Sequence, residues 1–96
     1  MFDLPSVTSK DMKIANKWRK FLIKNGFIML TESVYSRIAL NNSVALSVKK
    51  TVKENLPSNG LIQLLEITER QYVEMEYLLG VPQDKVVSSS ERYLEL

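Results

Sequence analysis

The chain has 96 residues, 45% of them hydrophobic, which suits one domain over residues 1–96. It contains no histidine and no cysteine, which excludes a Ser-His-Asp or Cys-His nucleophile and a zinc site with the usual ligands, and leaves carboxylates and a hard metal ion. Its net charge of +2 is unevenly distributed. Residues 1–53 carry ten Lys and Arg and three Asp and Glu, whereas residues 54–96 carry three Lys and Arg and eight Asp and Glu. The first half is therefore predicted to bind a polyanion.

A short apolar opening ends at Asp3 and is predicted to be the first strand. Ser9 is predicted to cap a helix with apolar residues at helical spacing, and Asn25-Gly26 is predicted to end it. Five lysines in steps of three and four residues form one stripe along this helix: Lys10, Lys13, Lys17, Lys20 and Lys24. Each adjacent like-charged pair costs about 0.2 to 0.5 kcal/mol, which a row of phosphates would offset; the alternative is an ordinary solvated face.

Two strands and a second helix are predicted next. Residues 27–30 and 33–40 are rich in β-branched and aromatic side chains, which favours strands. Asn41-Asn42-Ser43 is predicted to start the second helix, and Pro57 with Asn59-Gly60 is predicted to end it. Three basic residues of this helix are expected to face solvent: Lys49, Lys50 and Lys53.

The last third of the chain is less regular. Residues 61–67 are predicted to form an interior strand with both faces covered or partly covered, because their apolar run is nearly continuous. Over 68–80 the spacing of Thr68 and Gln71 favours a helix, whereas the alternation from Val73 to Leu79 favours a strand, so we predict one turn followed by a strand. Residues 82–90 are predicted to form a loop and 92–96 a short terminal strand.

This order of elements predicts an α+β, ferredoxin-like βαββαβ fold in which two helices cover an antiparallel sheet. The core fold is expected over residues 1–80, followed by a loop and a C-terminal strand over 81–96. Trp18 lies in the apolar seam of the first helix and is predicted to be a core residue, while the role of Tyr35 stays open. The aromatic motif of single-strand RNA recognition modules of similar fold is missing.

Several segments, in this order along the whole chain, closely resemble one protein family. They are Phe2-Asp3-Leu4-Pro5, Trp18-Arg19-Lys20-Phe21-Leu22, Gly26-Phe27-Ile28-Met29, Ser33-Val34-Tyr35-Ser36-Arg37 and Ile67-Thr68-Glu69-Arg70-Gln71. The family is the second core CRISPR-associated protein of spacer acquisition, particularly its type II versions. The resemblance implies a homodimer that lies between two dimers of the CRISPR integrase, with spacer DNA across the assembly.

The resemblance also implies a metal-dependent endonuclease acting on RNA or double-stranded DNA, with Asp3 as the catalytic, metal-holding residue. The expected ion is Mg²⁺ or Mn²⁺, since carboxylate and phosphate oxygens are the usual ligands of such ions. One Asp per protomer is too few, so two copies of Asp3 are expected to meet at the two-fold axis. The alternative is that Asp3 caps the turn before Leu4-Pro5.

Duplex DNA is expected to bind without regard to its sequence and with a steep dependence on salt. The expected phosphate contacts are Lys13, Lys17, Lys20 and Lys24, supplemented by Arg19 and Arg37. For Arg37 the alternative is an ion pair with Glu32 or with an acid of the partner. The terminal strand over 92–96 is expected to pair with the other protomer or the integrase through an exposed edge, and the acidic half to lie away from the DNA.

Family members usually have several more apolar residues before the Asp3 motif. Either the numbering begins at an internal methionine, or the first strand is abbreviated and the α-amino group lies close enough to Asp3 to compete with a cation. No apolar run approaches the roughly 20 residues of a membrane span, so we expect a cytoplasmic protein without membrane contact. Three functions remain open: the adaptation scaffold, a stand-alone Mg²⁺-dependent ribonuclease related to virulence-associated toxins, and a ferredoxin-like regulatory domain that binds a small molecule.

Overall fold

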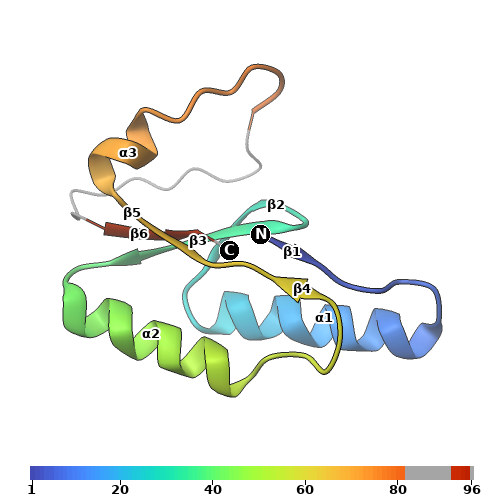
Figure 1. Cartoon of the computed structure of the whole chain (residues 1–96). Coiled ribbons are helices and arrows are strands. Elements are labelled where there is room, and N and C mark those ends of the chain that lie inside the picture. Colours follow the sequence, from blue (N-terminus) through green and yellow to red (C-terminus); the bar gives the residue numbers. More distant parts are fainter. Residues whose placement is uncertain (82–91, 96) are drawn as a thin grey trace.

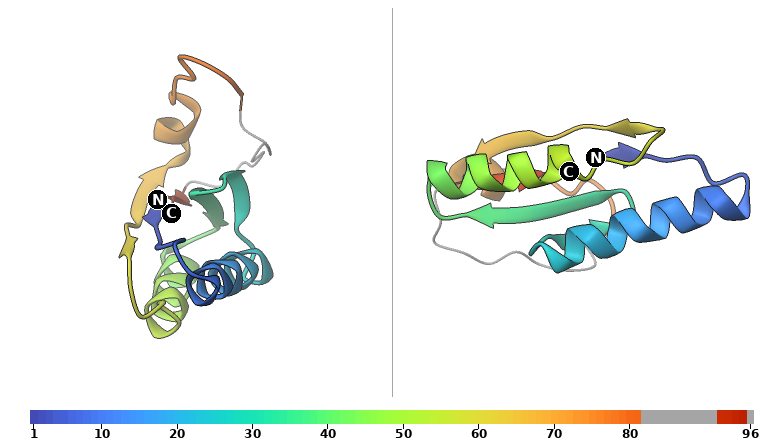
Figure 2. Two further views of the ribbon diagram at one scale, coloured as in Figure 1. Left: turned by 90° about the vertical axis from the view of Figure 1, so that its right-hand side faces the viewer. Right: turned by 90° about the horizontal axis from the view of Figure 1, so that it is seen from below.

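The computed structural model of the chain describes residues 1–81 and 92–95. Two long helices, α1 and α2, lie side by side against one face of an antiparallel sheet, and a short helix, α3, lies on the other side (Figure 1 and Figure 2). This arrangement confirms the predicted α+β, ferredoxin-like fold. None of the helices in the described ranges is long and apolar enough to cross a membrane.

Helix α1 spans Ser9–Lys24 and buries Ala15, Trp18 and Leu22, which lie on one face. Its N-cap is Thr8, not Ser9 as predicted. The Thr8 hydroxyl accepts a hydrogen bond from the backbone N–H of Asp11, and the Asp11 carboxylate accepts one from the backbone N–H of Thr8. This reciprocal capping box satisfies two helix-end donors, which a cap at Ser9 would not do. The helix ends at Asn25, followed by Gly26 with a φ of 86°, as predicted.

The next three elements also match the prediction closely. Strands β2 (Ile28–Thr31) and β3 (Val34–Ala39) pair antiparallel as a hairpin. Helix α2 (Asn42–Glu54) follows, with Asn41 as its N-cap, whose side-chain oxygen accepts from the backbone N–H of Val44 at 2.9 Å. The helix ends at Asn55, two residues before Pro57.

The predicted interior strand over 61–67 is wrong in two respects. The segment forms two short strands, β4 (Leu61–Ile62) and β5 (Leu65–Thr68), and β5 lies at the edge of its sheet. Leu61 and Leu65 are 49% and 61% exposed, so only one face of the segment is well covered. A continuous apolar run cannot by itself distinguish a covered face from an exposed apolar face.

Lys49 does not face solvent as predicted. Its ammonium group lies 2.6 Å from the Glu66 carboxylate, and both side chains are partly buried, 28% and 21% exposed. This ion pair ties the middle of α2 to β5. Lys50 and Lys53 are exposed, as predicted.

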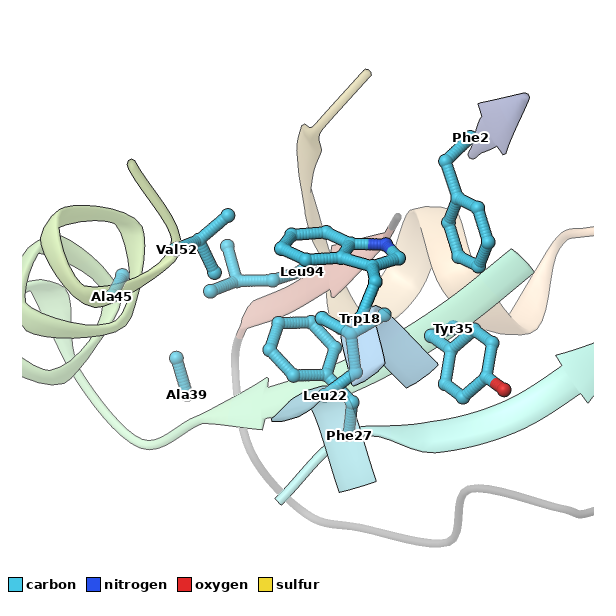
Figure 3. Packing of buried hydrophobic residues seen from close by; sticks show 9 residues of the cluster. All are labelled: Phe2, Trp18, Leu22, Phe27, Tyr35, Ala39, Ala45, Val52 and Leu94. Atoms are coloured by element: carbon cyan, nitrogen blue, oxygen red, sulfur yellow. The ribbon is translucent and has the colours of Figure 1, made fainter. Parts of the chain in front are cut away.

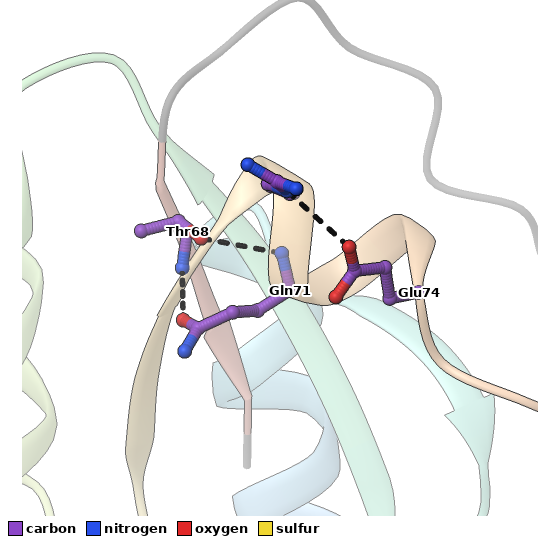
Figure 4. Close-up of polar contacts among 4 residues, drawn as sticks. Thr68, Gln71 and Glu74 are labelled. Atoms are coloured by element: carbon purple, nitrogen blue, oxygen red, sulfur yellow. Dashed lines mark hydrogen bonds and ion pairs between the residues drawn. The ribbon is translucent and has the colours of Figure 1, made fainter.

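Helix α3 (Glu69–Val73) provides the predicted turn, but no strand follows it over residues 74–81. Thr68 and Gln71 form a second capping box, and Arg70 forms an exposed ion pair with Glu74 (Figure 4). The alternating residues from Val73 to Leu79 are all exposed, so they have no sheet face to pack against. The predicted loop over 82–90 lies outside the described residues.

Two short strands lie one after the other between β3 and β4–β5, and we refer to their common position as the shared sheet slot. Strand β6 (Arg92–Glu95) pairs with β3 on one side and with β5 on the other. Strand β1 (Phe2–Asp3) pairs with β4 in the same slot, and the Phe2 N–H bonds to the carbonyl oxygen of Ser33 at 3.0 Å. Because both strands run antiparallel to β4–β5, β6 and β1 run in the same direction, one after the other.

The observed β6 confirms the predicted terminal strand but not its expected pairing. Both backbone edges of β6 are occupied within the chain, by β3 and β5, so this arrangement leaves no free edge for a partner strand. The side chain of Leu94 reaches the centre of the core and is fully buried. Position 96 of the predicted strand lies outside the described residues.

The core lies between the sheet and the two long helices (Figure 3). Its buried members come from strands β1, β3 and β6, from both long helices and from the residue just before β2: Phe2, Trp18, Leu22, Phe27, Tyr35, Ala39, Ala45, Val52 and Leu94. Trp18 is 3% exposed, which confirms its predicted core role, and Tyr35 is 1% exposed.

Candidate functional site

Asp3 is positioned by its neighbour Phe2. The Phe2 ring is 3% exposed and packs edge-on against Trp18, with 6.1 Å between ring centroids, and against Tyr35 at 5.6 Å. Within the described residues the indole N–H of Trp18 has no hydrogen-bond acceptor, and its nitrogen lies on the side of the ring toward Phe2 (Figure 3). Successive strand residues point to opposite sides, so burying Phe2 turns Asp3 outward.

The Asp3 carboxylate is exposed and makes no hydrogen bond or ion pair with the residues that the structure describes. The alternative role for Asp3, as a cap of the turn before Leu4-Pro5, has therefore no hydrogen bond to support it. The α-amino group of Met1 donates to the carbonyl oxygen of Gln63 at 2.9 Å, across the sheet. Asp3 thus remains accessible to a ligand.

The backbone at Asp3 is contacted closely by Gly60. This glycine has a φ of 100°, and a Cβ atom placed on it would lie 2.7 Å from both the Asp3 carbonyl oxygen and the Cδ2 atom of Leu4. Only a residue without a side chain fits this approach. In the sequence, Asn59-Gly60 indicates only a turn, and its contact with Asp3 was not predictable from local spacing.

A hollow of about 330 Å³ lies where β1 leaves the sheet, beside the turn between β2 and β3 and next to the first half of α1. We refer to it as the Asp3 hollow. Its lining residues are Phe2, Asp3, Leu4, Ser6, Met12, Ala15, Asn16, Arg19, Glu32 and Ser33. The lining contains two carboxylates, one guanidinium and several neutral oxygen donors, which suits a polar or ionic ligand.

Arg19 belongs to this hollow and not to the lysine stripe. Its Nε–H donates to the carbonyl oxygen of Glu32 at 3.2 Å, and its guanidinium carbon lies 5.8 Å from the centroid of the Phe2 ring. The side chain is partly buried. Burial raises the pKa of the nearby Tyr35 hydroxyl, the positive charge of Arg19 lowers it, and the Glu32 carboxylate raises it, so these opposite charges both act close to Tyr35.

The five lysines of α1 are all exposed. They run from the first to the last turn of the helix, a rise of roughly 21 Å at about 1.5 Å per residue. Duplex DNA presents one negative charge per roughly 1.7 Å of its axis, so a stripe of this length can contact several phosphates. The stripe therefore has the exposure and the length that the prediction requires.

Arg37 has backbone partners in the structure. Its Nε–H donates to the carbonyl oxygen of Asn25 at 2.9 Å, and an N–H of its terminal group donates to the carbonyl oxygen of Ile38. Gly26 leaves room for this side chain, since a Cβ there would lie 2.8 Å from the Arg37 Nε atom. Arg37 thus ties the end of α1 to β3, and a phosphate contact for it stays a prediction.

The structure brings Asp3, Arg19 and Glu32 together and leaves the lysine stripe and Arg37 outside the hollow. The sequence predicts Glu32 only as an alternative partner of Arg37, and no local pattern indicates that Glu32 lines the same hollow as Asp3. Among the described residues there is no group of three or more His, Cys, Asp or Glu side chains that could hold a metal ion.

Comparison with known proteins identifies the family. A protein named CRISPR-associated endoribonuclease Cas2 from Ligilactobacillus salivarius is 44% identical over 96 residues, which cover 100% of this chain and 95% of the relative. A protein of the same name from Streptococcus mutans is 43% identical over 96 residues, 100% of this chain and 90% of the relative. A third, from Treponema denticola, is 39% identical over 95 residues, 99% of this chain and 94% of the relative. The family model described as CRISPR associated protein Cas2 matches residues 1–75, and the chain therefore belongs to the Cas2 family.

Proposed function

We propose that this chain acts in CRISPR adaptation as a dimeric scaffold that binds duplex spacer DNA and bridges integrase subunits, and that it also cleaves phosphodiester bonds. The observation that carries the scaffold function is the row of exposed lysines on α1, which offers phosphate contacts at helical spacing. These contacts read no base edges, so any spacer sequence can bind.

Exposed apolar side chains on one face of the sheet support the proposed dimer. Glu66 reaches α2 through Lys49, so its neighbour Leu65 points to the opposite face of β5, away from the long helices. Leu65 and Leu61 are exposed by about half or more, although both belong to the sheet. A two-fold contact on this side would cover these apolar side chains and bring two copies of the sheet together.

The cleavage function is supported by the accessible Asp3 carboxylate and by the name endoribonuclease that the relatives carry. The chemistry of the Asp3 hollow fits a hard divalent ion such as Mg²⁺ or Mn²⁺, because its lining offers the carboxylates of Asp3 and Glu32 and neutral side-chain oxygens of Ser6, Asn16 and Ser33. Asp3 would hold the ion, which when bound supplies polarisation of the phosphodiester and activation of water.

The reaction is a hydrolysis of RNA or of DNA. The oxygen of a water molecule bonds to phosphorus, the bond from phosphorus to one ester oxygen breaks, and a proton from the water ends on the departing oxygen. The chain supplies no imidazole or thiol for this chemistry. Its own contributions are the position of Asp3, held by the buried Phe2, and the positive charge of Arg19 in the same hollow.

Asp3→Asn separates the two functions. The substitution keeps the size of the side chain and removes its charge, so we expect metal-dependent cleavage to be abolished while duplex binding and integration stay near wild-type levels. The measurements are cleavage of labelled RNA and DNA with Mg²⁺, filter binding of a duplex, and spacer integration with the purified integrase. Loss of integration together with cleavage would overturn the scaffold function, and undiminished cleavage would overturn the role of Asp3.

A further inference from the structure

Among the described residues that line the Asp3 hollow, Arg19 is the one cationic side chain. It lies in sequence between Lys17 and Lys20, but its side chain turns from the stripe toward Phe2 and the turn between β2 and β3. Neighbouring residues of a helix point about 100° apart, so the Arg19 side chain lies on a different face of α1 from Lys17 and Lys20.

Two contacts fix the plane of the Arg19 guanidinium. The hydrogen bond from Nε to the Glu32 carbonyl oxygen holds one edge, and the Phe2 ring lies 5.8 Å below the central carbon. The two terminal amino groups have no hydrogen-bond partner within the described parts of the chain. A guanidinium held in this way keeps its outer N–H groups available as a fork of donors.

Neither carboxylate of the hollow pairs with the Arg19 guanidinium. Asp3 and Glu32 line the same hollow, yet no ion pair joins either of them to Arg19 within 4.0 Å. A partly buried guanidinium without an ionic partner favours an incoming anion, and a phosphate accepts two of its N–H donors at once. The fixed plane lowers the entropy cost of that contact, in contrast to the free lysine side chains of the stripe.

We propose that Arg19 holds a single phosphate of the nucleic acid in the Asp3 hollow, and so orients the phosphodiester that faces Asp3. This inference rests on the proposed cleavage function and assigns Arg19 to cleavage instead of duplex affinity. The lysine stripe binds the length of the duplex, whereas Arg19 positions one phosphate at the carboxylate.

The first test is a titration of the wild-type protein, which needs no variant that must fold. The chain has four arginines, Arg19, Arg37, Arg70 and Arg92, so the side-chain Nε–H signals of ¹⁵N-labelled protein can be assigned individually. The probe is a ribodinucleotide with one phosphodiester, added without metal. We expect the Arg19 signal to shift saturably and the Arg70 signal, on the exposed helix α3, to stay in place.

The second test compares Arg19→Lys with Arg70→Lys. Lysine keeps the charge and most of the apolar stem over Phe2 but loses the fork, so we expect Arg19→Lys to lower the cleavage rate at saturating substrate about tenfold or more, with duplex affinity changed less than twofold. Arg70→Lys should change neither. Thermal melting establishes that both variants are folded.

The outcomes distinguish the two proposals. A shifted Arg19 signal in a wild-type protein that cleaves nothing would refute the cleavage function and support the phosphate site. Cleavage by wild type together with an unmoved Arg19 signal, or with wild-type rates in Arg19→Lys, would overturn the inference about Arg19 and leave the cleavage function standing.

Discussion

Two neighbouring residues fix the position of Asp3. Phe2 anchors the strand in the core, and Gly60 lies directly against the Asp3 carbonyl oxygen. The carboxylate itself has no partner in the described structure, so its orientation depends on the backbone that carries it. A small displacement of this backbone should therefore reach the candidate site.

Gly60→Ala tests this dependence. Alanine at a φ of 100° is strained by about 1 to 3 kcal/mol, and its Cβ would also lie 2.7 Å from the Asp3 carbonyl oxygen. Gly80→Ala is the matched control, since Gly80 has a φ of 78° but nothing within 4 Å of an added Cβ. We expect urea denaturation to show a larger loss of unfolding free energy for Gly60→Ala than for Gly80→Ala, and cleavage to fall only in the former. Equal losses in both variants would mean that the contact with Asp3 is unimportant.

At the residue scale, the sequence was sufficient for the side chains whose role depends on local spacing. The lysine stripe follows from helical periodicity, and all five lysines are exposed as that pattern requires. The association of Arg19 with Glu32 was not predictable, because it depends on where the turn between β2 and β3 meets α1. Sequence patterns specify the face of a helix but not the loop that packs against it.

Among the elements, strand β6 joins β3 to β5 in the sheet. It lies between β3 and β5 and places Leu94 in the core with no exposed surface. The predicted strand at this position was correct, and its two edges are paired within the chain, so its expected pairing with a partner stays a prediction. The alternation of polar and apolar residues identifies a strand but not its neighbours, and the continuous apolar run over 61–67 likewise does not specify which strands flank it.

Leu94→Ala should therefore destabilise the whole fold. Removing a fully buried leucine side chain costs about 2 to 5 kcal/mol, through lost burial and the cavity that remains. Leu65→Ala is the matched control on the adjacent strand, where the side chain is 61% exposed, and should cost much less. Equilibrium denaturation of both variants at low protein concentration measures the difference. A loss for Leu94→Ala no larger than that for Leu65→Ala would contradict the position of β6 in the core.

At the scale of the whole molecule, part of the charge division seen in the sequence appears as a division between two sides of the sheet within the described residues. The lysines of α1 and α2 lie on one side, and the acidic segment that includes Glu69, Glu74 and Glu76 lies with α3 on the other (Figure 1). Glu54 at the end of α2 and Glu66, which pairs with Lys49, lie toward the long helices, so the expectation that the acidic half lies away from the DNA stays a prediction. The exposed lysines of α1 nevertheless form a cationic surface on one side of the sheet.

Duplex affinity should therefore depend on where a charge is removed, and not only on how many remain. Each lost phosphate contact lowers the slope of log K against log salt by about 0.9. We expect this change for Lys17→Gln, together with weaker binding, and no change for Arg70→Gln, which removes the same charge from α3. Fluorescence anisotropy with a short duplex between 50 and 200 mM salt measures both slopes. Equal effects of the two substitutions would indicate attraction by net charge alone.

The shared sheet slot also relates the two termini of the chain. Glu95 pairs with Leu65 and Phe2 with Ile62, and Met1 exchanges hydrogen bonds with Gln63, so a single position opposite Leu64 separates the two strand segments. A fusion peptide or affinity tag placed before Met1 would have to leave the sheet at this point or contend with β6 for the same backbone partners.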